Sequence, residues 1–567
     1  MAVGSFVLVL HGHLPYVLKH GRWPHGEHWL FEVAAETWMP LLGVIDECLA
    51  QDRRFPVTLG LTPVLLEQLA HDAFKGGFVV WLDERIARAS RDEAEFRSAG
   101  ELHLAYLAGH WREHYQAMLS RFEALDRDLP AAFARHWDQG GLELLSSNAT
   151  HGYMPLLLHD ASCQANLRLG LETSERILGR RPRGIWLPEC AYRPGGSWTP
   201  PVLGGGARLR KGTDQILADE GVEYTFLDSH LLTGSRSEGV RQDGEFHKVS
   251  WEQAGWDHGR GWRSPLEPHL ASSDGGDGRL SVFARHPKVS EQVWSGEVGY
   301  PGDGRYLEFH KRHGQAGLRY WKVTGRDVDL GDKAAWHPDD IPGAVHGHAQ
   351  HFAASVRALL TEHREATGRH GVVVASFDAE LFGHWWHEGV GFLRDVMLAL
   401  QADPQVDTET AGEFLDGHPP DKVSWIPEGS WGAGGDHRVW LNEELRWTWE
   451  VEYRAEERFG QLCLTLPWQT HARVRGALER AGRELLLLQA SDWQFVIHTR
   501  GAQDYGLKRF ALHATRFDRM CEVAEDLAAG KRLSPVQRAQ LSEVDTHDDI
   551  FPVGPLRLDL WDTGDLG

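Results

Sequence analysis

The chain has 567 residues, of which 42% are hydrophobic and 25% charged, the balance of an ordinary globular protein and not of a disordered or membrane-embedded one. This length exceeds what one compact core accommodates, so two or three structural units are expected. The formal net charge of −22 would repel nucleic acid and anionic lipid and is compatible with a neutral substrate, although acidity also serves solubility alone.

The cysteine content argues against a disulfide-stabilised or zinc-ribbon protein. The five cysteines are widely spaced and include no Cys-x-x-Cys pair. The first apolar run, residues 5–10, is too short for a signal peptide or a membrane span. We therefore expect a cytoplasmic protein with no membrane or nucleic-acid partner.

Short apolar runs recur along the chain, and each ends at a polar residue. They are 6–10 before His11, 55–59 before Thr62, 142–145 before Asn148 and His151, 184–188 before Glu189, 224–227 before Asp228, and 371–377 before Asp378. Helical patterns separate them at 160–178 and 345–367, and the charged stretch 83–137 predicts an added helical layer. Strands that alternate with helices predict a parallel sheet with reactive residues at its carboxyl edge.

Composition changes divide the chain into four segments. Residues 1–192 and 279–425 form the first and second parts of the predicted catalytic barrel. Between them, residues 193–278 are rich in Gly, Ser, Asp and Trp, which indicates an inserted domain with a loop covering the cleft. From 426 to 567 strand signals fade, and the helical patterns at 471–490 and 505–529 predict a C-terminal helical domain.

Two carboxylates stand out as candidate catalytic groups. Glu189 follows a buried run and a proline and is flanked by aromatic residues. A carboxylate in this setting can serve as a nucleophile at an anomeric carbon, although the segment taken alone is equally compatible with an exposed loop glutamate. Asp378 ends a valine-rich strand beside several aromatic rings, and desolvation there would raise its pKa and favour a protonated general acid. Retaining glycosidases need this division of labour.

The extended His11-Gly-His13 segment has two interpretations. Its imidazoles could bind a metal with His151 or Asp378, or they could donate hydrogen bonds to sugar hydroxyls. Because no thiol ligand or His-Glu-x-x-His helix accompanies them, sugar binding is favoured. Trp431 and Trp440, in a glycine-rich stretch, could stack on pyranose rings or be buried under a domain interface.

Several motifs, taken in order, resemble glycoside hydrolase family 57. They are H-G-H-L-P-Y at 11–16, H-G-Y-M-P-L at 151–156, I-W-L-P-E-C-A-Y at 185–192, V-W-S-G-E-V-G-Y-P-G-D at 293–303, and S-F-D-A-E-L-F-G-H-W-W at 376–386. The stretches E-G-S-W-G-A-G-G-D-H at 428–437, S-D-W-Q-F at 491–495 and D-D-I-F-P at 548–552 are similar to the C-terminal part of the family's 1,4-α-glucan branching enzymes.

The resemblance implies an α/β fold: an incomplete (β/α)7 barrel with a small inserted domain and a C-terminal all-helical domain. It also implies a retaining transglycosylase without metal or organic cofactor, acting on α-glucans such as amylose and glycogen as donor and acceptor. Carried over by motif, Glu189 is the nucleophile and Asp378 the acid/base. The implied substrate-binding residues are His11, His13, His151, Arg285, Trp294, Gly302, Trp431, Trp440, Asp492 and Gln503.

One departure bears on the reaction outcome. Branching enzymes of this type are expected to carry a tyrosine on the loop over the cleft, yet no tyrosine lies between Tyr224 and Tyr300. Substitutes could come from Phe246, Trp251, Trp256 or Trp262. Without one, water could capture the intermediate, and the protein would be mainly an α-amylase-like hydrolase. A 4-α-glucanotransferase of the same family with little branching is a further alternative. More distant alternatives are a metal-dependent deacetylase or mannosidase using His11, His13 and Asp378, and a non-catalytic glucan-binding protein.

Overall fold

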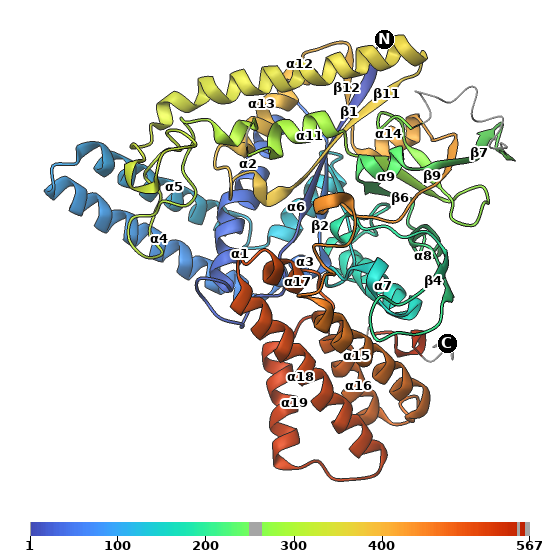
Figure 1. Cartoon of the computed structure of the whole chain (residues 1–567). Helices are drawn as coiled ribbons and strands as arrows, with labels where there is room; N and C mark the ends of the chain where they lie inside the picture. Colours follow the sequence, from blue (N-terminus) through green and yellow to red (C-terminus); the bar gives the residue numbers. More distant parts are fainter. Residues whose placement is uncertain (1, 249–262, 297, 553–555, 562–567) are drawn as a thin grey trace.

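The computed structural model describes residues 2–248, 263–296, 298–552 and 556–561 (Figure 1). Its centre is a parallel sheet with the strand order β11-β1-β2-β3. The strands are β1 (Gly4–Gly12), β2 (Val57–Leu61), β3 (Glu143–Leu145) and β11 (Gly371–Asp378), and β12 (Val406–Thr408) also pairs with β1. β1 is buried along its whole length, as expected for a parallel strand covered on both faces.

Parallel pairing continues beyond β3 through isolated bridges. Ser146 pairs with Ile185 and Gly184 with Tyr224, which leads to β6 (Tyr224–Leu227) and to its parallel neighbour β10 (Leu280–Ala284). The backbone N–H of His286, just after β10, donates to the Val374 carbonyl of β11 at 2.9 Å. This hydrogen bond links the segment after β10 to β11.

Alternate residues of these strands point into a small apolar cluster between them. Its members include Val7, Val9, Leu145, Trp186, Phe226, Phe283, Val372 and Val374. The other face of β1, with Phe6, Leu8 and Leu10, packs into the large outer core, as the two-residue period of a strand requires. The strands are thus buried on both sides, and their carboxyl ends carry the polar residues.

The predicted strands are mostly present, with two differences. The run 184–188 forms only the two bridges, because Pro188 begins a single turn of 3-10 helix (Pro188–Cys190) and cannot donate to a ladder. β10 was not predicted, since its five residues follow directly on a Gly- and Asp-rich loop.

Helices cover the sheet. In the N-terminal half they are α1 (Glu27–Val33), a π-helical turn η1 (Ala34–Trp38), α2 (Met39–Ala50), α3 (Pro63–Ala70), α4 (Asp72–Ser98), α5 (Leu102–Ala124), α6 (Leu129–Asp138) and α7 (Asp160–Leu178). The predicted helix 160–178 is confirmed, and Gly179 ends it in the left-handed conformation. The stretch 83–137 is helical as predicted, and α4 and α5 project as a pair from the sheet (Figure 1).

The segment between the two parts of the sheet forms a second, mixed sheet with the order β6-β10-β9-β13-β7-β8. Its further strands are β7 (Arg236–Gln242), β8 (Glu245–Lys248), β9 (His269–Ala271) and β13 (Lys422–Trp425). β13 lies near the predicted boundary at 425 but pairs with β7 and β9. The inserted segment therefore shares its sheet with a strand from much later in the chain.

The remaining elements complete the cover. Those of the inserted segment are β4 (Gly196–Trp198), β5 (Arg208–Arg210), α8 (Thr213–Asp219) and α9 (Ser229–Thr233). They are followed by α11 (Pro287–Trp294), α12 (Ile341–Thr367), α13 (Gly389–Gln401) and α14 (Ala411–Gly417). The predicted helix 345–367 corresponds to α12, which begins four residues earlier.

After β13 the described elements are helical. They are α15 (Arg446–Thr465), α16 (Ala472–Leu488), α17 (Asp492–His498), α18 (Gln503–Ala528) and α19 (Pro535–His547). In Figure 1 the long helices of this group lie side by side and extend away from the sheet, whereas α17 lies at their base. The predicted helices 471–490 and 505–529 correspond to α16 and α18. Across the described ranges, no helix combines the length and apolar character needed to cross a bilayer.

Candidate active site

A cleft of about 1000 Å³ opens at the carboxyl ends of the parallel strands. Residues that follow β1, β6, β10 and β11 form its floor, and α17 closes one side. Its lining includes His11, His13, Trp29, His151, Glu189, Asp228, Arg285, Trp294, Asp378, Glu380, Trp385, Trp431, Trp440 and Asp492. Both candidate catalytic carboxylates thus lie in one aromatic-walled cavity.

Glu189 is held in an uncommon backbone conformation. Its φ of 59° and ψ of 23° place it in the left-handed region, which costs a non-glycine residue about 1 kcal/mol or more. The indole Nε1 of Trp431 donates to Oε2 at 2.8 Å, and the hydroxyl of Ser491 donates to Oε1 at 3.2 Å. The turn and the two donors together fix the direction of the carboxylate.

Asp378 comes from the opposite wall. It is the last residue of β11, where it is in register with His11 of β1. Among the described residues, none donates a hydrogen bond to its carboxylate. Two residues further along, the Oε1 atom of Glu380 accepts the backbone N–H of His13 at 3.0 Å, which ties the loop after β11 to the loop after β1.

Burial dominates the proton affinity of both carboxylates. Desolvation and, to a smaller extent, the Asp492 charge raise the pKa of Glu189, and the hydrogen bonds from Trp431 and Ser491 lower it, with a net value of about 7. Desolvation and the Glu189 charge raise the pKa of Asp378 to about 7 as well. The predicted rise for Asp378 is present, but Glu189 shares it. Since only Glu189 accepts hydrogen bonds that favour an ionised form, the pair places its single proton preferentially on Asp378.

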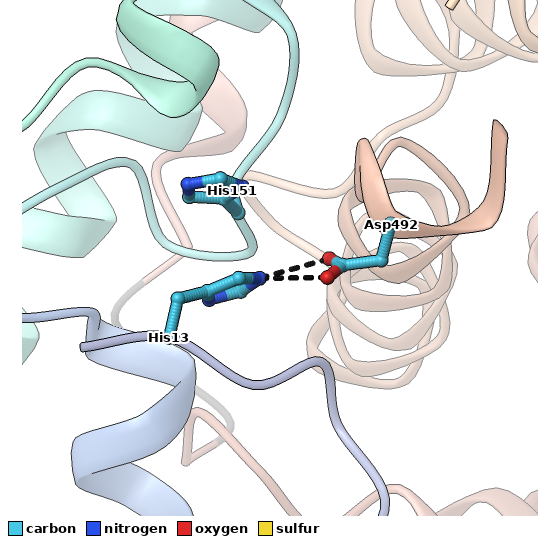
Figure 2. Close-up of side chains that lie close together, drawn as sticks. All are labelled: His13, His151 and Asp492. Atoms are coloured by element: carbon cyan, nitrogen blue, oxygen red, sulfur yellow. Dashed lines mark hydrogen bonds and ion pairs between the residues drawn. The ribbon is translucent and has the colours of Figure 1, made fainter. Parts of the chain in front are cut away.

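The three predicted histidines lie close together in the cleft, and Figure 2 shows two of them, His13 and His151, beside Asp492. His13 Nε2 lies 2.9 Å from both oxygens of Asp492, and the rings of His13 and His151 stack with centroids 3.9 Å apart. His11 Nε2 lies 3.1 Å from His151 Nε2, and His151 Nδ1 lies 2.9 Å from the Ser491 hydroxyl. Burial holds the pKa of His11 and of His151 well below the usual value, so both rings are neutral at pH 7.

His13, His151 and Asp492 also have donor atoms within 4.8 Å of one another, as a metal site would require. Imidazole lone pairs lie in the ring plane, and the planes of His13 and His151 are inclined by only 17°. Nearly parallel stacked rings do not converge on a tetrahedral centre, and His13 Nε2 is already paired with Asp492. The arrangement fits hydrogen bonding to sugar hydroxyls better than metal ligation.

A charged pair frames the other end of the floor. Arg285 Nε donates to Asp228 Oδ2 at 2.7 Å, and its guanidinium lies 5.4 Å from the centre of the Trp431 ring. Burial would raise the pKa of Asp228, but His230 and Arg285 lower it to about 2. Asp228 therefore stays ionised and holds Arg285 in place beside Trp431, the donor to Glu189.

Of the predicted substrate-binding residues, eight line the cleft and two do not. Those that do are His11, His13, His151, Arg285, Trp294, Trp431, Trp440 and Asp492. Gly302 lies under the Arg326 side chain, and Gln503 begins α18; neither is part of the cavity lining. Phe246, a candidate for the missing tyrosine, packs against Gly239 of β7, whereas Trp251, Trp256 and Trp262 lie outside the described residues.

The site residues that sequence reasoning did not assign to it include Trp29, Asp228, Glu380, Trp385 and Ser491. Four of these had a usable signal, since Asp228 follows a predicted strand, Glu380 and Trp385 lie within the motif around Asp378, and Ser491 begins the motif at 491–495. Trp29 is brought in by α1, at a sequence distance that no local pattern reveals.

Comparison with known proteins places this site in a family. The model of glycosyl hydrolase family 57 matches residues 7–427, and that of the 1,4-alpha-glucan branching enzyme C-terminal region matches residues 452–557. A 1,4-alpha-glucan branching enzyme of Thermococcus kodakarensis is 37% identical over 97% of this chain and 78% of its own. A probable 1,4-alpha-glucan branching enzyme of Mycobacterium tuberculosis is 32% identical over 93% of each chain.

Solved structures agree with these matches. The family 57-type branching enzyme of Pyrococcus horikoshii has a TM-score of 0.88 and 36% identity, covering 100% of this chain and 98% of that one. The alpha-amylase AmyC of Thermotoga maritima has a TM-score of 0.81 and 28% identity, covering 99% of each chain. With a family model matched over most of its length and relatives this similar over nearly all of it, the chain belongs to glycosyl hydrolase family 57.

Proposed function

We propose that the protein is a 1,4-α-glucan branching enzyme that cleaves α-1,4 linkages and forms α-1,6 branches with retention of configuration. The observation that carries the proposal is the pair of half-buried carboxylates, Glu189 and Asp378, in one aromatic-lined cleft with raised pKa values. The full-length similarity to branching enzymes supports the choice of reaction. Amylose- or glycogen-type α-glucans are the proposed donor and acceptor.

In the first half-reaction, ionised Glu189 attacks the anomeric carbon of an internal α-1,4-linked glucose. The C1–O4 bond breaks as Asp378 transfers its proton to the departing O4, and a glycosyl-enzyme ester remains on Glu189. The donors from Trp431 and Ser491 orient the attacking carboxylate, and ester formation removes the negative charge that burial disfavours. His11, His13, His151 and Arg285 would hold hydroxyls of the glucan.

In the second half-reaction, Asp378 is a base. It takes the proton from the 6-hydroxyl of an acceptor glucose as that oxygen attacks C1, and Glu189 leaves as a carboxylate. The product carries an α-1,6 branch, and Asp378 is protonated again for the next turnover. Transfer wins over hydrolysis when the acceptor is held in place and water is kept out.

The fold is proposed to serve this chemistry as an incomplete (β/α)7 barrel. The seven members would be β1, β2, β3, the segment at 184–186, β6, β10 and β11, which follow one another through parallel contacts. Residues 193–278 would be the inserted domain, and 426–567 the C-terminal helical domain, whose α17 provides Asp492 and Phe495 to the cleft.

Incubation with amylose tests the proposal. The wild-type protein is expected to lower iodine staining and create α-1,6 linkages, measured by proton NMR, with few new reducing ends. Glu189→Gln is expected to lower the rate of both changes by at least about a thousandfold, because it removes the nucleophile without changing its shape. Abundant reducing ends without α-1,6 linkages would overturn branching, and a Glu189→Gln variant with wild-type rates would overturn the carboxylate mechanism.

A second candidate is an α-amylase-like hydrolase. The observation in its favour is the similarity to the alpha-amylase AmyC of Thermotoga maritima, which extends over 99% of this chain. The two candidates share the glycosyl-enzyme step and differ only in whether water or a glucan hydroxyl completes the reaction. The ratio of α-1,6 linkages to reducing ends in the same incubation separates them.

A further inference from the structure

A second cavity of about 480 Å³ adjoins the catalytic cleft. The two cavities have one lining residue in common, Trp385. The walls of the second cavity come from residues 296–333 and from the loop that follows Asp378. We refer to it as the side groove.

Trp385 forms the junction between the cleft and the side groove. Its side chain is 50% exposed although it is one of the largest apolar side chains. The ring is not loose, because it packs on Phe309 with centroids 4.4 Å apart, and its backbone N–H donates to the Glu380 carbonyl at 3.1 Å. A fixed, exposed indole offers a flat apolar face of the kind that packs against pyranose C–H groups.

The side groove also carries hydrogen-bonding groups of both kinds. Arg326 lines it and is exposed, and within the described ranges its guanidinium has no hydrogen-bond or ion-pair partner. Glu308, also in the lining, is buried, and its Oε1 accepts from the His310 backbone N–H at 2.9 Å, with Lys333 Nζ 3.4 Å away from the other oxygen. A neutral polyhydroxyl ligand, which both donates and accepts, matches such a wall.

The backbone next to Arg326 is shaped to receive this side chain. A Cβ atom added at Gly302 would lie 2.9 Å from the Arg326 Nη2 atom and 3.0 Å from its Nε atom. Only a residue without a side chain therefore allows the guanidinium to lie where it does. This close approach places five potential N–H donors at the edge of the side groove.

We propose that the side groove binds the acceptor α-glucan chain, with Trp385 as the platform over which that chain enters the catalytic cleft. The proposal rests on the transfer reaction proposed above, in which a second glucan must present a hydroxyl to Asp378. Trp385 lies on the short loop that begins at Asp378. The hydrogen bond from its backbone N–H to the Glu380 carbonyl holds it close to the start of that loop. The donor chain then occupies the main cleft across Glu189.

The test uses two variants that change the side groove without touching the main cleft. Arg326→Ala removes the donors, and Gly302→Ala displaces them, at little risk to folding because the added Cβ meets the end of a flexible side chain. Trp447→Ala is the control, since Trp447 is a 41% exposed indole on α15 that lines neither cavity. The readout is the number of α-1,6 linkages formed per donor chain cleaved, with fluorescent maltoheptaose as acceptor.

Both groove variants are expected to lower this ratio by about fivefold, the effect of losing one hydrogen-bonding side chain, and to raise the apparent KM for the acceptor. Trp447→Ala is expected to keep the wild-type ratio. An unchanged ratio in Arg326→Ala overturns the proposal. So does an equal fall in donor cleavage and branching, which would mean that the groove holds the donor chain.

Binding without turnover separates the groove from the reaction. Maltoheptaose is titrated calorimetrically into Glu189→Gln protein, with and without Arg326→Ala. If Arg326→Ala weakens maltoheptaose binding at one of two sites by about fivefold, glucan binding in the side groove is supported. Identical isotherms for the two proteins overturn it. If the wild-type protein forms no branches from amylose, the branching function fails, and the calorimetric result still decides whether the groove binds glucan.

Discussion

The catalytic carboxylates of Glu189 and Asp378 and the carboxylate of Glu36, which forms a cluster with Arg319 and His384, are all withdrawn from water, but within the described ranges only Glu36 of these three is paired with a guanidinium. In the cluster, Arg319 Nη2 lies 2.5 Å and His384 Nδ1 2.7 Å from the two oxygens of Glu36. Burial raises the pKa of Glu36, and the Arg319 charge and the His384 hydrogen bond more than offset it, to about 2. In the cleft the same burial leaves Glu189 and Asp378 near 7.

The loop that follows Asp378 must be held rigidly in place, yet it adjoins carboxylates that must gain and lose protons. Glu36 is permanently ionised, and Arg319, which also donates to the His384 carbonyl at 3.2 Å, ties it to the loop carrying Trp385 and following Asp378. Glu189 and Asp378 lack a directly paired cation, so protons exchange on this pair near neutral pH, as acid/base catalysis requires. The ion pair of Glu36 with Arg319 holds the loop in place, and the unpaired carboxylates Glu189 and Asp378 remain able to exchange protons.

The largest expected effect comes from removing the negative charge of Glu36, which Arg319 and His384 compensate. Glu36→Gln would leave Arg319 buried without its counter-charge, so we expect a loss of roughly 3–5 kcal/mol in the free energy of unfolding. Urea denaturation at pH 7 measures it. Glu444→Gln, an exposed carboxylate on the surface before α15, is the matched control and should change stability by less than about 0.5 kcal/mol. A Glu36 variant as stable as this control would contradict the assigned role of the cluster.

A smaller and opposite effect is expected in the cleft. The pKa of Asp378 is about 7 in the folded protein and about 3.9 in an unfolded chain. A raised folded pKa contributes stability that is fully present below the unfolded value and is lost as pH rises through the folded value. Asp378→Asn has no proton to lose, so its stability advantage over wild type should be greater at pH 8 than at pH 5 by roughly 2 kcal/mol.

Unfolding of the two proteins measured at both pH values checks this expectation. Asp504→Asn, an exposed carboxylate in the first turn of α18, controls for the general effect of removing a negative charge. An advantage that shrinks at pH 8, or one that Asp504→Asn reproduces, would mean that Asp378 is not held in a desolvated site.

Much of the central sheet could be predicted because its strands are long apolar runs. Residues 6–10 and 371–377 became β1 and β11, and the helix at 160–178 was bounded by its capping glycine. β10 was not predicted, because five residues after a Gly-rich loop show little hydrophobic periodicity. The run at 184–188 was predicted as a full strand because its composition is apolar, but Pro188 ends the pairing there. Pairing between β13 and the inserted segment is long-range and leaves no local signal.

The site divides in the same way. Glu189, Asp378 and the three histidines lie in compact motifs at strand ends, so residue type and context indicated them before any contact was known. Trp29 reaches the cleft from α1, outside the other motifs in sequence, so nothing local indicated it. Gly302 and Gln503, expected from the resemblance to contact glucan, lie outside the cleft, and the environment of Gly302 belongs to the side groove instead.

The central claim is that Glu189 is the nucleophile and Asp378 the acid/base, and rescue by azide tests it most directly. Glu189→Ala and Asp378→Ala are each given α-maltosyl fluoride, whose fluoride leaves without acid assistance, and sodium azide. We predict that Glu189→Ala yields the β-maltosyl azide, because azide replaces the missing nucleophile, and that Asp378→Ala yields the α-maltosyl azide, because azide then attacks the glycosyl-enzyme. The reversed pair of products, or wild-type turnover by Glu189→Ala without azide, would contradict the assignment.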